Sequence, residues 1–136
     1  MYWYQSQHAM PNFLDPTLRR VQAYAKRSGE YSAWYMLNVY PQRATNPNNM
    51  DTDDNYCMEI HLRNLATIEE LLSTIEQADV WCAWGAVIDD TKRTYLSELL
   101  FGNEDKNIQG IISLFSGNYH FKAYGATIKG YPKHPL

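Results

Sequence analysis

Apolar residues along this chain alternate between two spacings, and that alternation limits the fold more than any other feature. Short continuous apolar runs at 33–40 and 80–85 are typical of strands covered on both faces, as in a parallel sheet. Around them, apolar residues recur every three or four positions, which is typical of amphipathic helices. The pattern predicts a three-layer α/β domain with a small, mostly parallel central sheet flanked by helices. At 136 residues the chain has the length of one such domain, over 1–136.

Two helices are predicted before residue 80. The first starts at Asp15, which caps the free amide groups, followed by Pro16 at the first helical position. Gly29 is the expected stop of this helix. The second helix begins at Asn64, or at a capping box over 67–70.

Three further elements are predicted after the run at 80–85. A helix covers 89–101 and is closed by Gly102. A short helix over 107–115 is interrupted by Gly110, and 120–124 is a strand.

Two cysteines, Cys57 and Cys82, are too few for a disulfide framework, and neither belongs to a CxxC pair. This usage is typical of a reducing cytoplasm. No apolar stretch approaches the roughly 18–20 residues that a membrane span needs. We therefore expect a cytoplasmic protein without a membrane segment.

The charge balance and the missing motifs exclude several function classes. Twelve basic residues against fifteen acidic ones give a net charge of −3, which argues against non-specific binding of duplex DNA. The phosphate-binding patterns GxGxxG and GxxxxGK[ST] are absent, as are HExxH and GxSxG. The four histidines lack metal-ligand spacing, so we expect no metal ion and no cofactor.

Polar residues gather where the run at 33–40 ends, and the loop over 42–54 follows it. Asn38 lies inside the apolar run, where its amide either bonds neighbouring backbone or faces a ligand. Arg43 either holds a phosphate or carboxylate or pairs with a nearby acid, and Thr45 and Asn46 follow it. The acids that Arg43 can reach in sequence are Asp51, Asp53 and Asp54.

The last loop, 125–136, carries Lys129, Lys133 and His134 among glycine and prolines. A histidine in such a loop after a strand is suited to donate a hydrogen bond to a phosphate or a developing anion. The alternative is a solvated basic tail.

Five short blocks follow one another along the chain. They are 15–20 (Asp-Pro-Thr-Leu-Arg-Arg), 38–40 (Asn-Val-Tyr), 43–47 (Arg-Ala-Thr-Asn-Pro), Trp84-Gly85 and 130–136 (Gly-Tyr-Pro-Lys-His-Pro-Leu). Taken together and in this order, they resemble a bacterial and phage family known as domain of unknown function 1643. Asn64 falls where that family keeps a helix-start asparagine. The resemblance covers nearly the whole chain but implies no established activity.

More loosely, the family's loops after its first and last strands are similar to those of the uracil-DNA glycosylase superfamily. That similarity implies that Asn38 reads a base and that His134 stabilises the departing anion. The family's Asn-Pro-Ser is absent here, and the first fourteen residues hold no carboxylate to position water. Either that group is lost, or Asp15 and His8 substitute for it. The chain also starts later than most members, which leaves open whether a leading strand or hairpin is absent.

These observations favour a protein directed at a nucleobase, nucleotide or nucleic acid, with a glycosylase-like site at the carboxyl ends of the strands. Whether it is an enzyme or a former enzyme that only binds stays open. The alternative is a non-catalytic binding module, either a small-ligand sensor or a protein–protein inhibitor, which an aromatic content of 14% suits. A third interpretation is a structural domain whose polar motifs only cap helices and tie loops.

Overall fold

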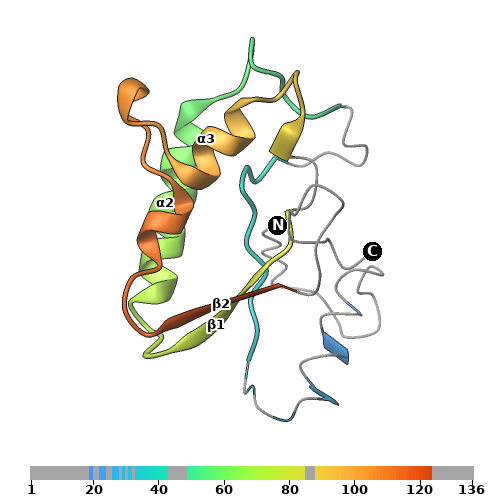
Figure 1. Cartoon of the computed structure of the whole chain (residues 1–136), viewed down its shortest axis with the longest axis vertical. Coiled ribbons are helices and arrows are strands. Elements are labelled where there is room, and N and C mark those ends of the chain that lie inside the picture. Colours follow the sequence, from blue (N-terminus) through green and yellow to red (C-terminus); the bar gives the residue numbers. More distant parts are fainter. Residues whose placement is uncertain are drawn as a thin grey trace.

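A computed structural model describes residues 19, 22–23, 26–27, 29, 31, 33–42, 49–84 and 88–123. Helices and a small parallel sheet alternate along this part of the chain, so the predicted α/β class is confirmed (Figure 1). The elements are α2 (Met58–Leu72), β1 (Ala78–Cys82), α3 (Tyr95–Phe101), the 3-10 helices η4 (Glu104–Lys106) and η5 (Ile111–Leu114), and β2 (Tyr119–Ala123).

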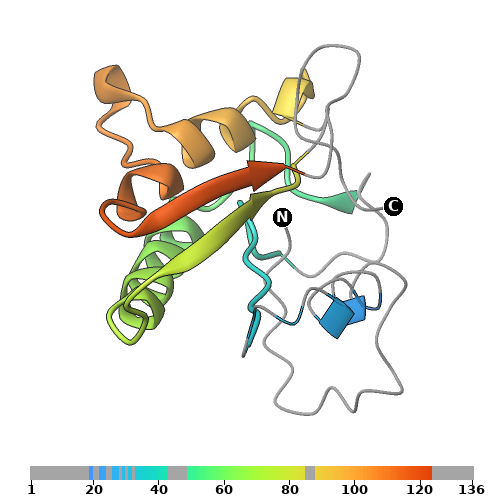
Figure 2. The same ribbon diagram turned by 60° about the horizontal axis from the view of Figure 1, so that its bottom comes forward.

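The sheet that is described consists of β1 and β2, paired in parallel (Figure 2). The register runs from Ala78 opposite Tyr119 to Cys82 opposite Ala123, so both strands end at the same level. Two parallel neighbours need a crossover connection, and here α3, η4 and η5 supply it. Both strands were predicted from sequence, each within two residues of its observed start.

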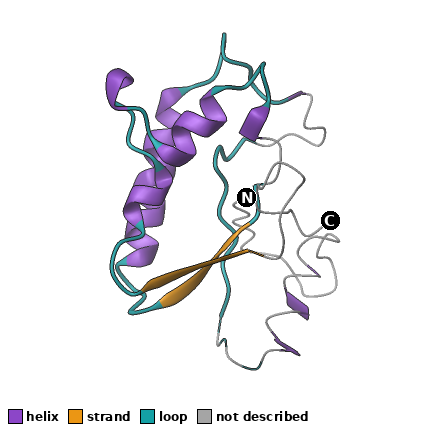
Figure 3. Ribbon diagram, in the orientation of Figure 1, coloured by secondary structure: helices purple, strands orange, loops and turns teal. Residues whose placement is uncertain are grey.

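The core lies where the helices meet the end of β1, and Figure 3 shows α2 and α3 above the strand pair. Helix α2 contributes Leu65 and Ile68 from one face, and α3 contributes Leu99 and Leu100. These positions follow the helical spacing of the sequence, and burying them removes apolar surface from water. The remaining core residues are Val39, Tyr40, Cys82, Trp84, Ile88, Tyr95, Leu96 and Ile111.

The predicted helix at 15–29 is helical at each of its positions that the structure describes before the stop. Gly29 has a φ of 64°, the left-handed conformation in which glycine ends helices. The described helical residues are Arg19, Gln22, Ala23, Lys26 and Arg27.

The prediction that a helix begins at Asn64 is wrong, because α2 begins at Met58. Asn64 lies in the middle of α2. Residues 67–70, predicted as a capping box, also lie inside α2 and do not start a helix. His61 and Asn64 are both buried on the face that also carries Leu65 and Ile68. Because these two residues on the buried face are polar, the first turns of α2 show no apolar periodicity in the sequence.

The prediction of a strand at 33–40 is also wrong: the segment has no regular secondary structure and bends at Val39 and Tyr40. Tyr35 is 59% exposed, so this part of the run is not covered on both faces. The carbonyl of Asn38 accepts a hydrogen bond from a side chain, Asn64 Nδ2 at 2.8 Å. The apolar character of the run therefore reflects the burial of its last residues in the core and does not indicate pairing in a sheet.

The helices predicted at 89–101 and 107–115 are shorter than expected. Helix α3 starts only at Tyr95, where the carboxylate of the distant Asp53 accepts a hydrogen bond from the Tyr95 amide. Gly102 closes it as predicted, with a φ of 90°. Asn107 adopts a left-handed φ of 56°, which ends η4 and separates it from η5. The backbone of Gly110 is extended rather than helical, and a Cβ at this position would overlap the backbone of Phe101 and Gly102, so the close approach requires glycine.

Candidate functional site

Most of the residues that the sequence singles out lie outside the described part of the chain. Asn38 is described, and so are the residues that flank the segments 43–48 and 124–136. The site is therefore built from these flanks. The predicted residues outside the described part are Asp15, Arg43, Thr45, Asn46, Lys129, Lys133, His134 and the alternative His8.

Asn38 is 5% exposed and lies directly before the bend at Val39 and Tyr40. The buried side chain of Asn64, on α2, donates a hydrogen bond from Nδ2 to the Asn38 carbonyl oxygen at 2.8 Å. A buried carbonyl outside a sheet needs such a donor, since leaving it unsatisfied costs about 1–3 kcal/mol. Asn64 thus fixes the chain at the residue predicted to bind a ligand.

The carboxyl ends of β1 and β2 form one edge, with Cys82 opposite Ala123. Trp84 follows β1 at this edge, and its ring meets that of Phe101 edge to face at 5.7 Å. Trp84 Nε1 is buried and has no acceptor among the residues that the structure describes. In sequence, the segment with Lys129, Lys133 and His134 follows β2 directly.

Two described residues on either side of the segment 43–48 are hydrogen-bonded to each other. Gln42 Nε2 donates to Asp51 Oδ1 at 3.0 Å, and the Asp51 amide donates to Gln42 Oε1 at 2.7 Å. The Tyr40 hydroxyl donates to the other carboxylate oxygen, Asp51 Oδ2, at 2.8 Å. This two-way pairing joins Gln42, directly before the segment 43–48, to Asp51, three residues after it, and we refer to Tyr40, Gln42 and Asp51 as the loop clamp.

The clamp is in turn anchored to the amino end of α3. The Tyr95 hydroxyl donates to the Asp51 carbonyl at 2.7 Å, and Arg93 donates to the Met50 carbonyl at 3.0 Å. Asp53 receives a hydrogen bond from the Tyr95 amide at 3.0 Å. Each bond joins residues 42–44 positions apart in sequence, so a distant helix holds the end of this loop.

The side chains of Tyr40, Tyr95 and Asp53 each keep one ionisation state around neutral pH. Burial raises the pKa of the Tyr40 hydroxyl to about 12, and burial likewise raises the pKa of Tyr95. Burial alone would raise the pKa of Asp53, but hydrogen bonds from Thr94 and the Tyr95 amide outweigh it, and the net pKa is lowered. Both phenols therefore stay neutral donors while Asp53 stays charged.

Sequence reasoning treated Asp51 and Asp53 only as partners for Arg43. In the structure Asp51 bonds Gln42 and Tyr40, while Asp53 bonds the amino end of α3. No local pattern signals these roles, because the partners on α3 are more than forty residues away. The density of acids and amides in the loop was the one available clue.

A second polar group lies on the sheet itself. Asp79 of β1 accepts a hydrogen bond from the Tyr31 hydroxyl and forms an ion pair with Lys122 of β2 at 2.9 Å. These two contacts, with Tyr31 first, hold the pKa of Asp79 below its usual range. The group joins residue 31 to both strands, with Asp79 three residues before the end of β1 and Lys122 one residue before the end of β2.

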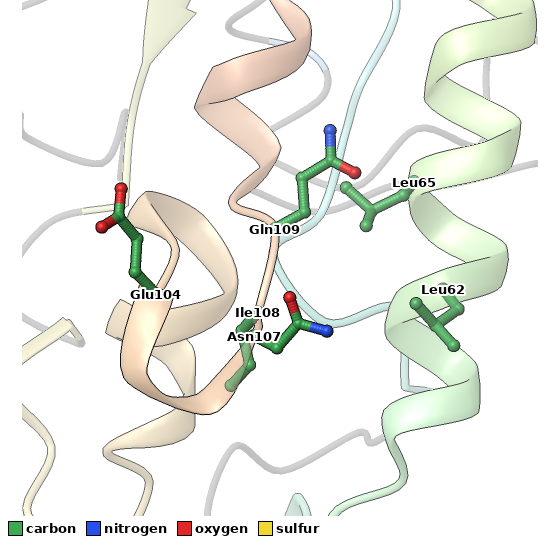
Figure 4. A pocket seen from close by; sticks show the side chains of 6 residues that line it. All are labelled: Leu62, Leu65, Glu104, Asn107, Ile108 and Gln109. Atoms are coloured by element: carbon green, nitrogen blue, oxygen red, sulfur yellow. The ribbon is translucent and has the colours of Figure 1, made fainter.

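A shallow cavity of about 430 Å³ lies between α2 and the turn at 104–109 (Figure 4). Leu62, Leu65 and Ile108 provide its apolar wall, and Leu62 is 57% exposed. The cavity contains none of the residues predicted to bind a ligand. Its polar lining residues are Glu104, Asn107 and Gln109.

Neither a metal site nor a membrane-spanning helix occurs among the described residues. No three of their His, Cys, Asp and Glu side chains come together as a metal site. No helix among them has both the length and the apolar character to cross a membrane.

Comparison with known proteins identifies a family. The model of the family described as "Protein of unknown function (DUF1643)" matches residues 5–136, nearly the whole chain. The protein therefore belongs to the DUF1643 family. No curated protein and no solved structure matches the chain significantly.

Proposed function

We propose that this DUF1643 protein binds a nucleobase or nucleotide at the carboxyl edge of its parallel sheet, in a glycosylase-like arrangement. His134 would stabilise a departing anion and Asp15 would position water. The residues that we assign to ligand binding are Asn38, Arg43, Thr45, Asn46, Lys129 and Lys133.

The parallel pairing of β1 and β2 with level carboxyl ends carries this proposal. Open parallel sheets bind their ligands outside the carboxyl ends of the strands. Here the basic segment 124–136 follows β2 directly, and Trp84 follows β1. The buried Trp84 Nε1, without an acceptor in the described part of the chain, leaves one hydrogen-bond donor near this edge.

The chemistry of the assigned residues suits a free nucleotide or a single strand better than a duplex. Arginine and lysine hold phosphate, and an asparagine amide offers both a donor and an acceptor to a base edge. The net charge of −3 would oppose non-specific binding to duplex DNA, but a protein with this charge can still contain one local basic site.

A thermal-shift screen tests the proposal, with nucleobases, nucleosides, mono- to triphosphates and short single- and double-stranded oligonucleotides. A ligand at about a hundred times its Kd adds roughly 2.7 kcal/mol to the free energy of unfolding. That increase corresponds to a rise of several degrees in Tm. We expect Arg43→Ala and His134→Ala to abolish the shift of the best ligand.

Two matched variants control for the loss of an arginine or a histidine. Arg63→Ala removes an exposed arginine on α2, and His120→Ala removes an exposed histidine on β2. Both should keep the full shift. A shift that survives in Arg43→Ala and His134→Ala, or no shift with any compound, overturns the proposal.

Release of free uracil from a uracil-containing single-stranded oligonucleotide tests catalysis separately. We expect release by the wild type and none by His134→Ala or Asp15→Asn. Binding without release would assign the protein to the alternative class, a non-catalytic binding module.

One observation favours that alternative in its protein-binding form. Leu62 is 57% exposed at the edge of the cavity between α2 and the turn at 104–109. If no nucleotide shifts the Tm, affinity capture with the wild type and Leu62→Glu is the next experiment. A partner retained by the wild type and lost by Leu62→Glu would support the binding module.

A further inference from the structure

We propose that the cavity between α2 and the turn at 104–109 is a docking site for a basic, leucine-rich helical segment of a partner protein. None of the residues assigned to nucleotide binding lines this cavity, so the proposal stands independently of the proposed function. Every residue that carries it lies in the described part of the chain.

Leu62 is the apolar residue at this cavity that the protein's own core leaves uncovered. It is 57% exposed, and among the described residues the core cluster takes in Leu65 and, at its edge, Ile108, but not Leu62. Figure 4 shows Leu62 and Leu65 on α2, across from the turn that carries Ile108. A single exposed leucine is common on protein surfaces, but a leucine at the rim of a hollow with an apolar wall gives a partner side chain a place to pack.

The exposed stripe of α2 continues from Leu62 along the helix. Ala66 and Glu69 follow at the fourth and seventh positions, so they share one helix face with Leu62, and all three are exposed. The small side chain of Ala66 allows another helix to approach closely. From Leu62 to Glu69 the stripe extends about 10 Å along the axis, or about two turns, which a helix of a partner can follow.

The elements that border the cavity are acidic. Residues 58–72 (α2) and 95–106 (α3 to η4) contain six acidic and two basic residues, a net charge of −4, whereas the whole chain carries −3. Both basic residues already form ion pairs, Arg63 with Glu59 at 2.6 Å and Lys106 with Glu98 at 2.7 Å. The other four carboxylates form no ion pair within the described part of the chain. They belong to Glu69, Glu70, Glu104 and Asp105.

An apolar hollow with an acidic border fits a partner segment that is both apolar and basic. Amphipathic helices dock by placing apolar side chains, spaced by three or four residues, into such grooves. Lysines beside these apolar residues would meet the carboxylates of the border. The cavity is shallow, whereas a small molecule needs a site that encloses most of its surface. The negative charge of this face would repel nucleic acid, which leaves a protein segment as the occupant.

Fluorescence anisotropy with the full chain tests the proposal. The probe is a fluorescein-labelled helical peptide of fourteen residues, Leu-Lys-Lys-Leu-Leu-Lys-Leu repeated twice. Two matched peptides carry glutamate in place of every lysine, or serine in place of every leucine. We expect only the first peptide to bind, and to bind more weakly in about 500 mM than in about 50 mM NaCl, because salt screens exposed charges.

Leu62→Ser and Glu104→Lys separate the apolar contribution from the charge contribution. We expect Leu62→Ser to weaken binding of the lysine peptide about tenfold, because an apolar contact is lost. Glu104→Lys should weaken binding about fivefold at low salt and less at high salt. Both residues are exposed, so the Tm of each variant should stay within about two degrees of the wild type.

Two control variants make the same kinds of change elsewhere. Tyr35→Ser removes an apolar residue that is 59% exposed in the segment 33–40, and Glu76→Lys reverses an exposed charge beyond the end of α2. Both should bind the lysine peptide like the wild type. The proposal is overturned if the wild type does not bind this peptide, if Leu62→Ser binds it with unchanged affinity, or if the controls lose as much affinity as Leu62→Ser.

A second copy of the chain is the other occupant that has to be tested. Size-exclusion chromatography with light scattering, at several protein concentrations, measures the mass of the wild type and of Leu62→Ser. A wild-type dimer that dissociates in Leu62→Ser would overturn the proposal, because the cavity would then be an interface between two copies. The thermal-shift screen with nucleotides is a separate measurement, so failure of the docking proposal leaves the proposed function intact.

Discussion

Two regions of the molecule meet at α3, one stabilised by apolar burial and the other by hydrogen bonds. Along most of the helix, Leu99 and Leu100 are fully buried among apolar side chains of α2 and η5. At its amino end, Arg93 and Tyr95 hold the loop at 50–53 through hydrogen bonds of 2.7–3.0 Å. Apolar burial supplies free energy with little directional preference, whereas the hydrogen bonds specify distances and angles. A site that must hold ligand groups in place depends on the second region more than on the first.

Leu99→Ala should give the largest loss of stability, because it opens a cavity in the apolar region. We expect the free energy of unfolding to fall by about 2–5 kcal/mol. Urea unfolding followed by circular dichroism measures this loss. Trypsin cleavage after Arg63, in the middle of α2, requires unfolding and should become faster, and an unchanged rate would contradict the predicted loss.

Tyr40→Phe should give the next largest loss, because it removes hydrogen bonds rather than apolar contacts. The substitution keeps the ring but removes the hydroxyl that donates to Asp51 and accepts from the Cys57 amide at 2.9 Å. We expect a loss of roughly 1–3 kcal/mol, since two part-buried groups lose a partner. The loss should be smaller than that of Leu99→Ala, and urea unfolding of both variants measures the two losses. An equal loss in both variants would contradict the comparison.

His61 provides a pH-dependent test of the apolar region. It is fully buried on α2, and its Nε2 lies 2.8 Å from the Gln109 carbonyl. Burial lowers the pKa of His61, so the unfolded chain takes up a proton before the folded one does. Stability therefore falls as the pH drops below about 6.5, by at most about 1.4 kcal/mol per pH unit.

His61→Gln should remove this part of the pH dependence. Unfolding at several pH values between 8 and 5, in the wild type and the variant, measures the difference. Parallel curves for the two proteins would show that His61 does not titrate within this range.

Arg63→Ala should have the smallest effect. Arg63 pairs with Glu59 at 2.6 Å on the outer face of α2, but both side chains are mostly exposed. Exposed pairs of this kind contribute less than about 0.5 kcal/mol. A larger loss in urea unfolding would mean that the surface of α2 contributes more than its exposure indicates.

The sequence predicted the parts of the fold that depend on local pattern. Both strands of the sheet and the helix ends at Gly29 and Gly102 are where apolar runs and glycine placed them. The start of α2 was missed because His61 and Asn64 are polar residues with buried partners. The run at 33–40 was assigned to a strand because burial and strand pairing leave the same apolar pattern.

The site was predictable only as a set of residue types in two loops and one apolar run. Asn38 was singled out as a polar residue in an apolar run, and it is buried and fixed there. The roles of Asp51 and Asp53 were not predictable, since their partners on α3 lie beyond the range of any local spacing rule. Folding alone brings these groups together.

The parallel pairing of β1 and β2 has a consequence for biosynthesis. A chain is made from its amino end, so β1 leaves the ribosome before α3, η4, η5 and β2. Until 119–123 emerges, β1 lacks the neighbour that it has in the finished sheet. Parallel pairs of this kind form late because the intervening chain must close first. During synthesis the chain therefore passes through a stage in which α2 has already been made while β1 is not yet paired with β2.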